Sequence, residues 1–306
     1  MVFDSIIIGG GPAGLAASIY ALRAGLNACI LERLFEGGQL ANIHSAENYP
    51  GFDEISGVDL IERFASHANK YGNKTVNEEV LEINVNISGI KPIFTVKTDQ
   101  NTYETRTIIV ATGASPAKLN AIGEDLYTGK GVSYCATCDG AFYKNRDVAV
   151  IGGGNTALQD AAYLSRLCGK IYIVHRRDKF RAENYLVDAC RGLNNVETVF
   201  DTVLAEISGN LSVNRIRVKH VKSGAESEIP VAGVFIAVGL TPAAEFVKNL
   251  LDLDEKGFIV TDQHMRTSVP GIFAAGDVRT SPLRQIVTAA ADGAVAAHSA
   301  SEFINS

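Results

Sequence analysis

The 306-residue chain is predicted to be an α/β protein that contains the same βαβ unit twice. Each copy reads as an apolar strand, a glycine-rich turn, a helix and a second apolar strand. The first copy runs from Asp4 to Leu31 and the second from Asp147 to Val174, and a constant offset relates all equivalent residues. Because strands that alternate with helices form parallel sheets, two domains of this kind are expected.

Both turns carry glycines with the spacing of a dinucleotide-binding motif. Gly9 allows the tight turn, Gly11 lets a pyrophosphate approach the backbone, and Gly14 lets the helix pack closely on the strand. The other predicted contacts at the two turns are Pro12, Ala13, Gly152, Gly154, Asn155 and Thr156. A pyrophosphate would lie at the free N–H groups and positive end of each helix. One motif could be only a tight turn, but two copies in the same context predict two dinucleotide sites.

The end of the second strand in each copy predicts which dinucleotide binds. Glu32 ends this strand in the first copy, where a carboxylate can accept hydrogen bonds from ribose hydroxyls. The equivalent residue in the second copy is His175, which Arg176, Arg177 and Arg181 follow. Guanidinium groups bind a 2′-phosphate well. The first site therefore suits FAD and the second NADPH, although a basic cluster can also be a solvated helix start.

Cys135 and Cys138 form a C-x-x-C motif. They could form a redox-active disulfide, they could bind zinc, for which no second C-x-x-C exists here, or they could be inert core residues. Asp139 could exchange a proton with a leaving thiolate or cap the following turn. Two dinucleotide sites favour the redox interpretation, because they supply a donor and a carrier of electrons. The remaining cysteines are expected to be buried apolar side chains: Cys29, Cys168 and Cys190.

Composition and charge exclude other classes of protein. A net charge of −6 argues against a nucleic-acid surface. The longest apolar runs are too short to span a bilayer. Residues 3–8 already read as a buried strand, so no signal peptide and a cytoplasmic location are expected.

These motifs together resemble those of the bacterial low-molecular-weight thioredoxin reductases, and the resemblance covers essentially the whole chain. The segments that carry it are Gly9–Gly14, Gly37–Leu40, Glu47–Gly51, Cys135–Asp139, His175–Arg177 with Phe180–Arg181, and Gly276–Asp277 with Arg284–Gln285. The resemblance implies that the basic cluster binds the 2′-phosphate. It also implies further FAD contacts, namely Gly38, Gln39, Leu40, Asn48, Thr112, Gly113, Gly276, Asp277, Arg284 and Gln285. Gln159 and Asp160 stand where the family usually has two glutamates.

The same resemblance implies an architecture and a mechanism. Two Rossmann-like dinucleotide-binding domains, of the three-layer β/β/α FAD/NAD(P)-binding type, are expected, with the second inserted into the first. The FAD domain would comprise residues 1–113 and 246–306, and the NADPH domain residues 116–243. Hydride would pass from NADPH to FAD, and electrons then to the Cys135–Cys138 disulfide and to thioredoxin or a thioredoxin-like protein. The inserted domain would rotate between the two half-reactions, and the enzyme would be a homodimer.

Two other functions remain open from the residues. One is a flavin-dependent NADPH reductase that serves ferredoxin or a peroxidase-reducing module. The other is a non-enzymatic sensor that reads NADP levels, which would have no need of a flavin together with a dithiol.

Overall fold

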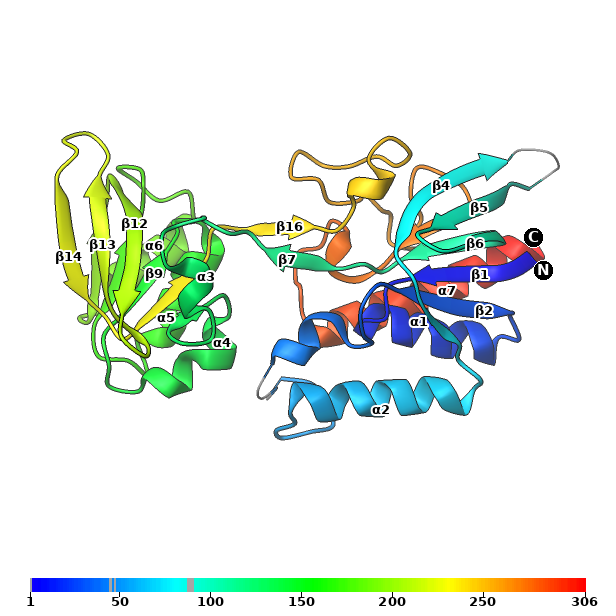
Figure 1. The fold of residues 1–306 in the computed structure, drawn as a ribbon, viewed down its shortest axis with the longest axis horizontal. Coiled ribbons are helices and arrows are strands. Elements are labelled where there is room, and N and C mark those ends of the chain that lie inside the picture. The colour runs from blue at the N-terminus through cyan, green and yellow to red at the C-terminus, as the bar shows by residue number, and fades with distance from the viewer. Residues whose placement is uncertain (1, 44–45, 47, 87–90) are drawn as a thin grey trace. The chain divides into compact units, whose positions relative to one another are not determined.

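The computed structural model describes residues 2–43, 46, 48–86 and 91–306, so Glu47 of the predicted FAD segment lies outside the described residues. The chain divides into two compact units. The discontinuous unit comprises Met1–Ser115 and Thr241–Ser306, and the inserted unit comprises Pro116–Leu240. The chain passes between them twice, through the paired strands β7 (Ala114–Pro116) and β16 (Leu240–Pro242) (Figure 1). Within the described ranges, no helix is long and apolar enough to cross a membrane.

The discontinuous unit is built on a seven-stranded sheet with the order β3-β2-β1-β6-β5-β4, in which β17 also pairs with β6. The pairs among β1, β2, β3, β6 and β17 are parallel, whereas β4 and β5 continue the sheet in antiparallel fashion. The strands are β1 (Val2–Ile8), β2 (Ala28–Glu32), β3 (Thr75–Asn77), β4 (Val80–Asn86), β5 (Ile93–Thr98), β6 (Thr102–Val110) and β17 (Ile272–Ala274).

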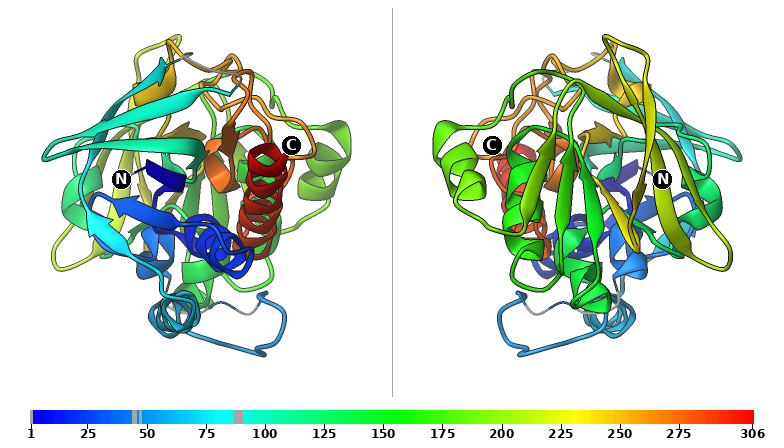
Figure 2. Two further views of the ribbon diagram at one scale, coloured as in Figure 1. Left: turned by 90° about the vertical axis from the view of Figure 1, so that its right-hand side faces the viewer. Right: turned by 90° about the vertical axis from the view of Figure 1, so that its left-hand side faces the viewer.

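Helices α1 (Pro12–Arg23) and α7 (Ile286–Asn305) pack against each other in this unit, as the left view of Figure 2 shows in blue and red. Small residues permit the close approach, since a Cβ at Gly293 of α7 would overlap the carbonyl oxygen of Ala13. The remaining elements of the unit are α2 (Gly57–Lys70), η1 (Gly38–Asn42), η3 (Glu245–Val247) and η4 (Gly276–Val278). α7 begins after its N-cap Gln285, whose N–H donates to Thr288 Oγ1 at 3.0 Å.

The inserted unit contains a parallel sheet with the order β11-β10-β9-β15-β8 and a separate antiparallel sheet, β12-β13-β14 (Figure 2, right). The parallel strands are β8 (Val132–Ser133), β9 (Val148–Ile151), β10 (Ile171–Val174), β11 (Val196–Val199) and β15 (Gly233–Ile236). The antiparallel strands are β12 (Thr202–Gly209), β13 (Val213–His220) and β14 (Glu226–Pro230). Its helices are α3 (Glu124–Tyr127), α4 (Ala136–Asp139), η2 (Gly140–Tyr143), α5 (Asn155–Leu164) and α6 (Asn184–Arg191).

Strand β9 shows how the inserted unit is layered. Val148 and Val150 contribute to a core with the buried face of α5, whereas Ala149 and Ile151 contribute to a core with the antiparallel sheet. Successive side chains of a strand point to opposite faces, so helices cover one face of the parallel sheet and strands cover the other. The predicted α/β fold class with a repeated βαβ unit is confirmed.

Candidate functional site

The glycine turn after β1 forms an open cradle at the start of α1. Gly9 has φ +106° and a Cβ there would overlap the carbonyl oxygen of Ala111, so this position requires glycine. A Cβ at Gly14 would overlap the carbonyl oxygen of Gly9, as expected for a helix packed tightly on its strand. In contrast, no described atom lies within 4 Å of a Cβ at Gly11. The backbone in front of α1 is therefore accessible to a pyrophosphate, as the predicted FAD site requires.

Glu32 is fixed at the edge of this cradle. Its Oε2 accepts the N–H of Gly10 at 2.7 Å, and its Oε1 accepts the N–H of Leu34 at 2.9 Å. Each carboxylate oxygen can accept a second hydrogen bond. A ribose beside the turn would find two oriented acceptors.

Segments that are far apart in the sequence converge on the same turn. Gly37 donates its N–H to the carbonyl of Gly10 at 2.8 Å, and a Cβ at Gly38 would lie 3.6 Å from the Cα of Gly11. A Cβ at Gly276 would lie 2.9 Å from the Cβ of Ala13. The discontinuous unit thus brings three of the predicted FAD segments together.

The other predicted FAD contacts lie in the same unit, with their own partners. Asn48 Nδ2 donates to Gln285 Oε1 at 2.9 Å, Thr112 Oγ1 donates to the carbonyl of Ala243 at 2.7 Å, and Gln39 Nε2 lies 3.5 Å from Ser115 Oγ. Gly113 accepts the N–H of Ala243. Leu40 differs, because its side chain is buried in a core with Leu60 and anchors η1, of which it is part, to α2.

Gly276, the residue before Asp277, is held by a side chain that the sequence motifs do not contain. Asp292 of α7 accepts the N–H of Gly276 at 3.1 Å and pairs with Arg279 at 3.4 Å. Burial raises the pKa of both Asp277 and Asp292, and nearby arginines partly oppose this effect. Arg284 lies 4.0 Å above the ring of Phe258. Asp292 was not predicted from the sequence, because its contacts with Gly276 and Arg279 join residues that are more than ten positions apart, and such contacts leave no local pattern.

The second glycine turn, in the inserted unit, is also open in front of its helix. No described atom lies within 4 Å of a Cβ at Gly154, the residue before α5. Asn155 Oδ1 accepts the N–H of Glu183 at 3.0 Å, and Arg181 donates its N–H to the carbonyl of Gly153 at 2.7 Å. These bonds anchor the basic segment to the turn. Thr156 is exposed in the first turn of α5.

His175 lies beneath this turn rather than on the surface. Its side chain is 4% exposed, its ring packs against Gly153 and stacks on Phe180 at 5.8 Å, and its Nε2 has no hydrogen-bond partner among the described residues. Burial lowers the pKa of His175, and the charges of Arg181, Arg177 and Arg176 lower it further. The ring is therefore neutral at pH 7 and supports the turn.

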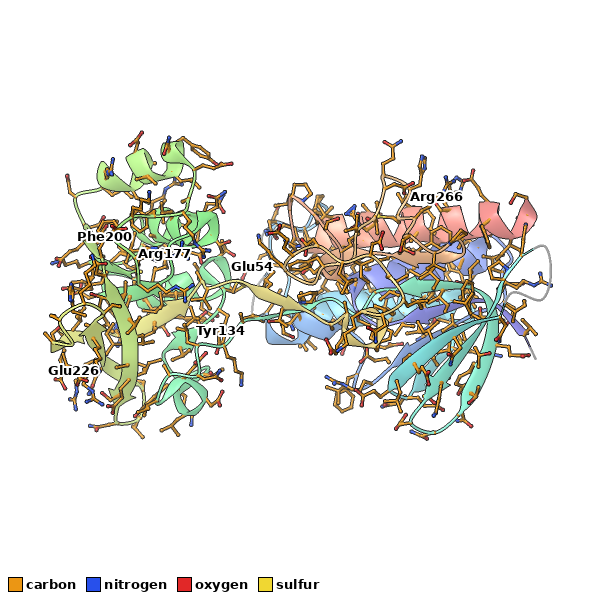
Figure 3. The ribbon with its side chains drawn as sticks, turned by 90° about the horizontal axis from the view of Figure 1, so that it is seen from above. Glu54, Tyr134, Arg177, Phe200, Glu226 and Arg266 are labelled. Atoms are coloured by element: carbon orange, nitrogen blue, oxygen red, sulfur yellow. A yellow bond between two sulfur atoms is a disulfide. The ribbon has the colours of Figure 1, made fainter. Side chains whose placement is uncertain are left out.

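The three arginines are exposed around this histidine and make no ion pair within the described ranges. Arg177 is labelled in Figure 3, and its carbonyl accepts the N–H of Asp201. α6 begins at Asn184, after the cluster, so the arginines are not its solvated first turn. They are available to bind a phosphate.

Cys135 and Cys138 are joined in a disulfide with an S–S distance of 2.06 Å. Two polar groups lie near Cys135 Sγ: the backbone nitrogen of Cys138 at 3.2 Å and Thr137 Oγ1 at 3.4 Å. Asp139 is partly buried beside the disulfide and caps no described N–H of η2 with its side chain. Within the described residues, no group of three or more His, Cys, Asp or Glu side chains could hold a metal ion.

The redox motif packs on the helix that the second glycine turn begins. Ala136, 1% exposed, belongs to the same core as Ala157 and Leu158 of α5. A Cβ at Gly140 would lie 2.9 Å from Leu164, so glycine permits this close packing. The unpaired cysteines are buried as predicted: Cys29, Cys168 and Cys190.

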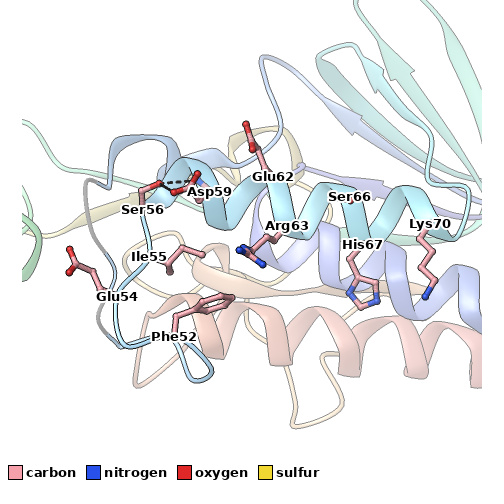
Figure 4. Close-up of a pocket in the computed structure, with 10 residues that line it drawn as sticks. All are labelled: Phe52, Glu54, Ile55, Ser56, Asp59, Glu62, Arg63, Ser66, His67 and Lys70. Atoms are coloured by element: carbon pink, nitrogen blue, oxygen red, sulfur yellow. Dashed lines mark hydrogen bonds between the residues drawn. The ribbon is translucent and has the colours of Figure 1, made fainter.

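A hollow of about 1110 Å³ runs along α2 in the discontinuous unit (Figure 4). Arg63 lies 5.2 Å above the ring of Phe52, and Ser56 bonds to Asp59. None of the residues that line this hollow is a predicted cofactor contact.

Comparisons with known proteins agree with this arrangement. Residues 3–293 match the model of the pyridine nucleotide-disulphide oxidoreductase family. The thioredoxin reductase of Listeria innocua is 46% identical over 99% of this chain and 94% of its own, and that of Bacillus subtilis is 41% identical over 99% and 95%. The crystal structure of the Streptococcus pyogenes thioredoxin reductase is 42% identical, has a TM-score of 0.85 and covers 99% of this chain and 98% of its own.

The chain belongs to the thioredoxin reductase family. Family membership makes it a flavoprotein disulfide oxidoreductase that uses a pyridine nucleotide. The disulfide Cys135–Cys138 fits the redox-active disulfide of that family.

Proposed function

We propose that the protein is an NADPH-dependent, FAD-containing thioredoxin-disulfide reductase. The observation that carries the proposal is the packing of the Cys135–Cys138 motif on α5, the helix begun by the second dinucleotide turn. The relatives named thioredoxin reductase support thioredoxin as the protein substrate.

The two units would bind different dinucleotides. The discontinuous unit would hold FAD through the cradle at Gly11, the carboxylate of Glu32 and the segments that converge on them. The inserted unit would hold NADPH at Gly154, with its 2′-phosphate on Arg176, Arg177 and Arg181. When bound, FAD accepts hydride from a nicotinamide and donates an electron pair to a disulfide.

The cysteines have distinct surroundings once the disulfide is reduced. The N–H of Cys138 and the hydroxyl of Thr137 both lie at Cys135 Sγ, where they would stabilise a thiolate. We therefore assign attack on the thioredoxin disulfide to Cys135. Asp139 would supply the proton that the leaving thiolate needs and would recover it in the next cycle.

Motion of the inserted unit follows from the distribution of sites. The NADPH site and the disulfide belong to one unit and the FAD site to the other, so the flavin must meet each of them in turn. The chain passes from one unit to the other through β7 and β16, which would allow rotation about two short strands. Three unpaired cysteines agree with a reducing, cytoplasmic location, and the family resemblance implies a homodimer.

The test is NADPH oxidation with and without thioredoxin. The wild-type protein should oxidise NADPH at a rate that rises with added thioredoxin. The Cys138→Ser variant should be slower by more than about a hundredfold, although NADPH should still reduce its flavin. Cys190→Ser is the matched control, because Cys190 is buried and donates to the carbonyl of Leu158, as serine can.

Full turnover by Cys138→Ser would contradict the dithiol mechanism. A colourless protein that stays so with added FAD would favour the sensor instead. Equal turnover with NADH would contradict the assignment of the three arginines.

A further inference from the structure

Two large apolar side chains are exposed immediately after Glu32. Leu34 is 59% exposed and Phe35 is 82% exposed, in the short segment between β2 and η1. An aromatic ring in water forgoes the stabilisation that burial would provide. Such exposure beside a binding cradle indicates a surface that a ligand covers.

The segment is well anchored, so the exposure does not come from a loose loop. Leu34 donates its N–H to Glu32 and accepts a bond from Asn77 Nδ2 at 2.8 Å. Gly37 donates to the carbonyl of Gly10 at 2.8 Å. The backbone on both sides of Phe35 is thereby tied to β3 and to the glycine turn.

The second βαβ copy carries charged residues at the corresponding places. The repeat offset that relates Glu32 to His175 relates Leu34 to Arg177 and Phe35 to Asp178. Both of these are exposed in the inserted unit. The apolar pair is therefore specific to the first dinucleotide turn and is not a property of the repeated backbone.

A base is the part of FAD that this pair can reach. The adenine is bonded to the same ribose whose hydroxyls Glu32 is placed to bind, so it must lie within a few ångströms of the residues next to Glu32. Stacking of a base on an aromatic ring raises affinity by roughly tenfold or more.

We propose that Phe35, with Leu34 beside it, covers the adenine of FAD and makes the discontinuous unit select FAD over FMN. The inference rests on the proposed binding of FAD in this unit. Riboflavin phosphate lacks the adenosine half, so it gains nothing from this ring.

The experiment is release of flavin from the holoenzyme after dilution, followed by the rise in flavin fluorescence. Phe35→Ala should release FAD roughly ten times faster than the wild type or more. Phe35→Tyr, which keeps the ring face, should restore the wild-type rate within about twofold. Tyr185→Ala is the matched control, because it removes an aromatic side chain that is 63% exposed on α6 of the other unit.

A second arm uses protein whose FAD has been exchanged for FMN. Release of FMN should be equally fast in the wild type and in Phe35→Ala. FAD release that Phe35→Ala leaves unchanged, or FMN release that it accelerates as much as FAD release, would overturn the role of Phe35 and leave the proposed function intact. A wild-type protein that neither contains nor takes up FAD would overturn both.

Discussion

The two βαβ copies have similar turns but differ in the side chain that meets the middle glycine. In the first copy, Glu32 accepts the N–H of Gly10 through a carboxylate oxygen. In the second copy, the neutral ring of His175 packs against Gly153. The middle glycine therefore donates a hydrogen bond to a carboxylate in one unit and packs against a buried imidazole ring in the other.

The two copies share the space in front of the helix and differ at the end of the second strand. Both copies keep open space in front of the helix, at Gly11 and at Gly154, where a pyrophosphate can lie. Selectivity comes from the end of the second strand, where a carboxylate suits ribose hydroxyls and a cluster of arginines suits a phosphate.

The helices of the two copies also differ. Gly14 of α1 corresponds to Ala157 of α5, and Ala17 corresponds to Asp160. α7 packs on α1 near Ala17, since a Cβ at Gly293 would lie 3.0 Å from the Ala17 nitrogen. A buried carboxyl at that place in α1 would be costly.

The largest effect on stability is expected when Gly14 of α1 is replaced by alanine, the residue that the second copy has at the equivalent position. Gly14→Ala should destabilise the discontinuous unit by about 3 kcal/mol, because the new methyl overlaps the Gly9 carbonyl and the backbone must move. Urea unfolding, followed by the release of flavin fluorescence, measures this change.

The converse exchange is the control. Ala157→Gly should cost only about 1–2 kcal/mol, from helix propensity and a small lost contact. If Gly14→Ala proved as mild as Ala157→Gly, the two turns would be equally tight and this part of the comparison would fail.

The sequence predicts the repeated part of the fold well, for a physical reason. Both turns and their strands are local patterns of glycine and apolar residues, and the structure places β1, α1 and β2 and their counterparts β9, α5 and β10 there. The burial of the three unpaired cysteines was likewise predictable, because they lie in apolar strands and helices and behave as small apolar side chains.

The sequence reveals less where a site depends on tertiary contact. Asp292 holds Gly276 from α7, and His175 turns inward beneath Gly153, and neither orientation follows from spacing. The predicted cofactor roles of the individual residues stay predictions. What the structure adds is that Gly37, Gly276 and Ala13 meet at one turn.

A smaller effect is expected from the arginines that distinguish the second copy. Arg177→Ala should raise KM for NADPH by roughly ten- to a hundredfold, since a charge-assisted bond to phosphate contributes about 1.5–3 kcal/mol. KM for NADH, which lacks the phosphate, should stay within about twofold of the wild type.

Arg191→Ala is the matched control for this prediction. Arg191 is an exposed arginine of the same unit that pairs with Asp188 at 3.5 Å. An equal rise in KM in both variants would mean that NADPH responds to general positive charge and not to this cluster.

The smallest effect concerns Asp160, the carboxyl that replaces Ala17 in the second copy. Burial raises the pKa of Asp160 to about 7, above the value near 3.9 of an unfolded aspartate. The folded state therefore holds the proton more tightly, and the contribution of this residue to stability falls as pH rises through the window from about 4 to 7. Between pH 5.5 and 8.5 the wild type should lose about 1 kcal/mol relative to Asp160→Asn, since the carboxyl is only partly buried.

Urea unfolding of the inserted unit at both pH values measures that difference. Asp188→Asn is the control, because it removes an exposed acidic group of the same unit, on α6. A wild-type curve parallel to that of Asp160→Asn would show that Asp160 ionises as freely as a surface carboxyl. In that case α5 would tolerate the charged form of Asp160 because water reaches it, whereas the equivalent Ala17 of α1 is fully buried where α7 packs. A divergence of the expected sign would show that α5 partly buries Asp160 and that the carboxyl compensates by keeping its proton.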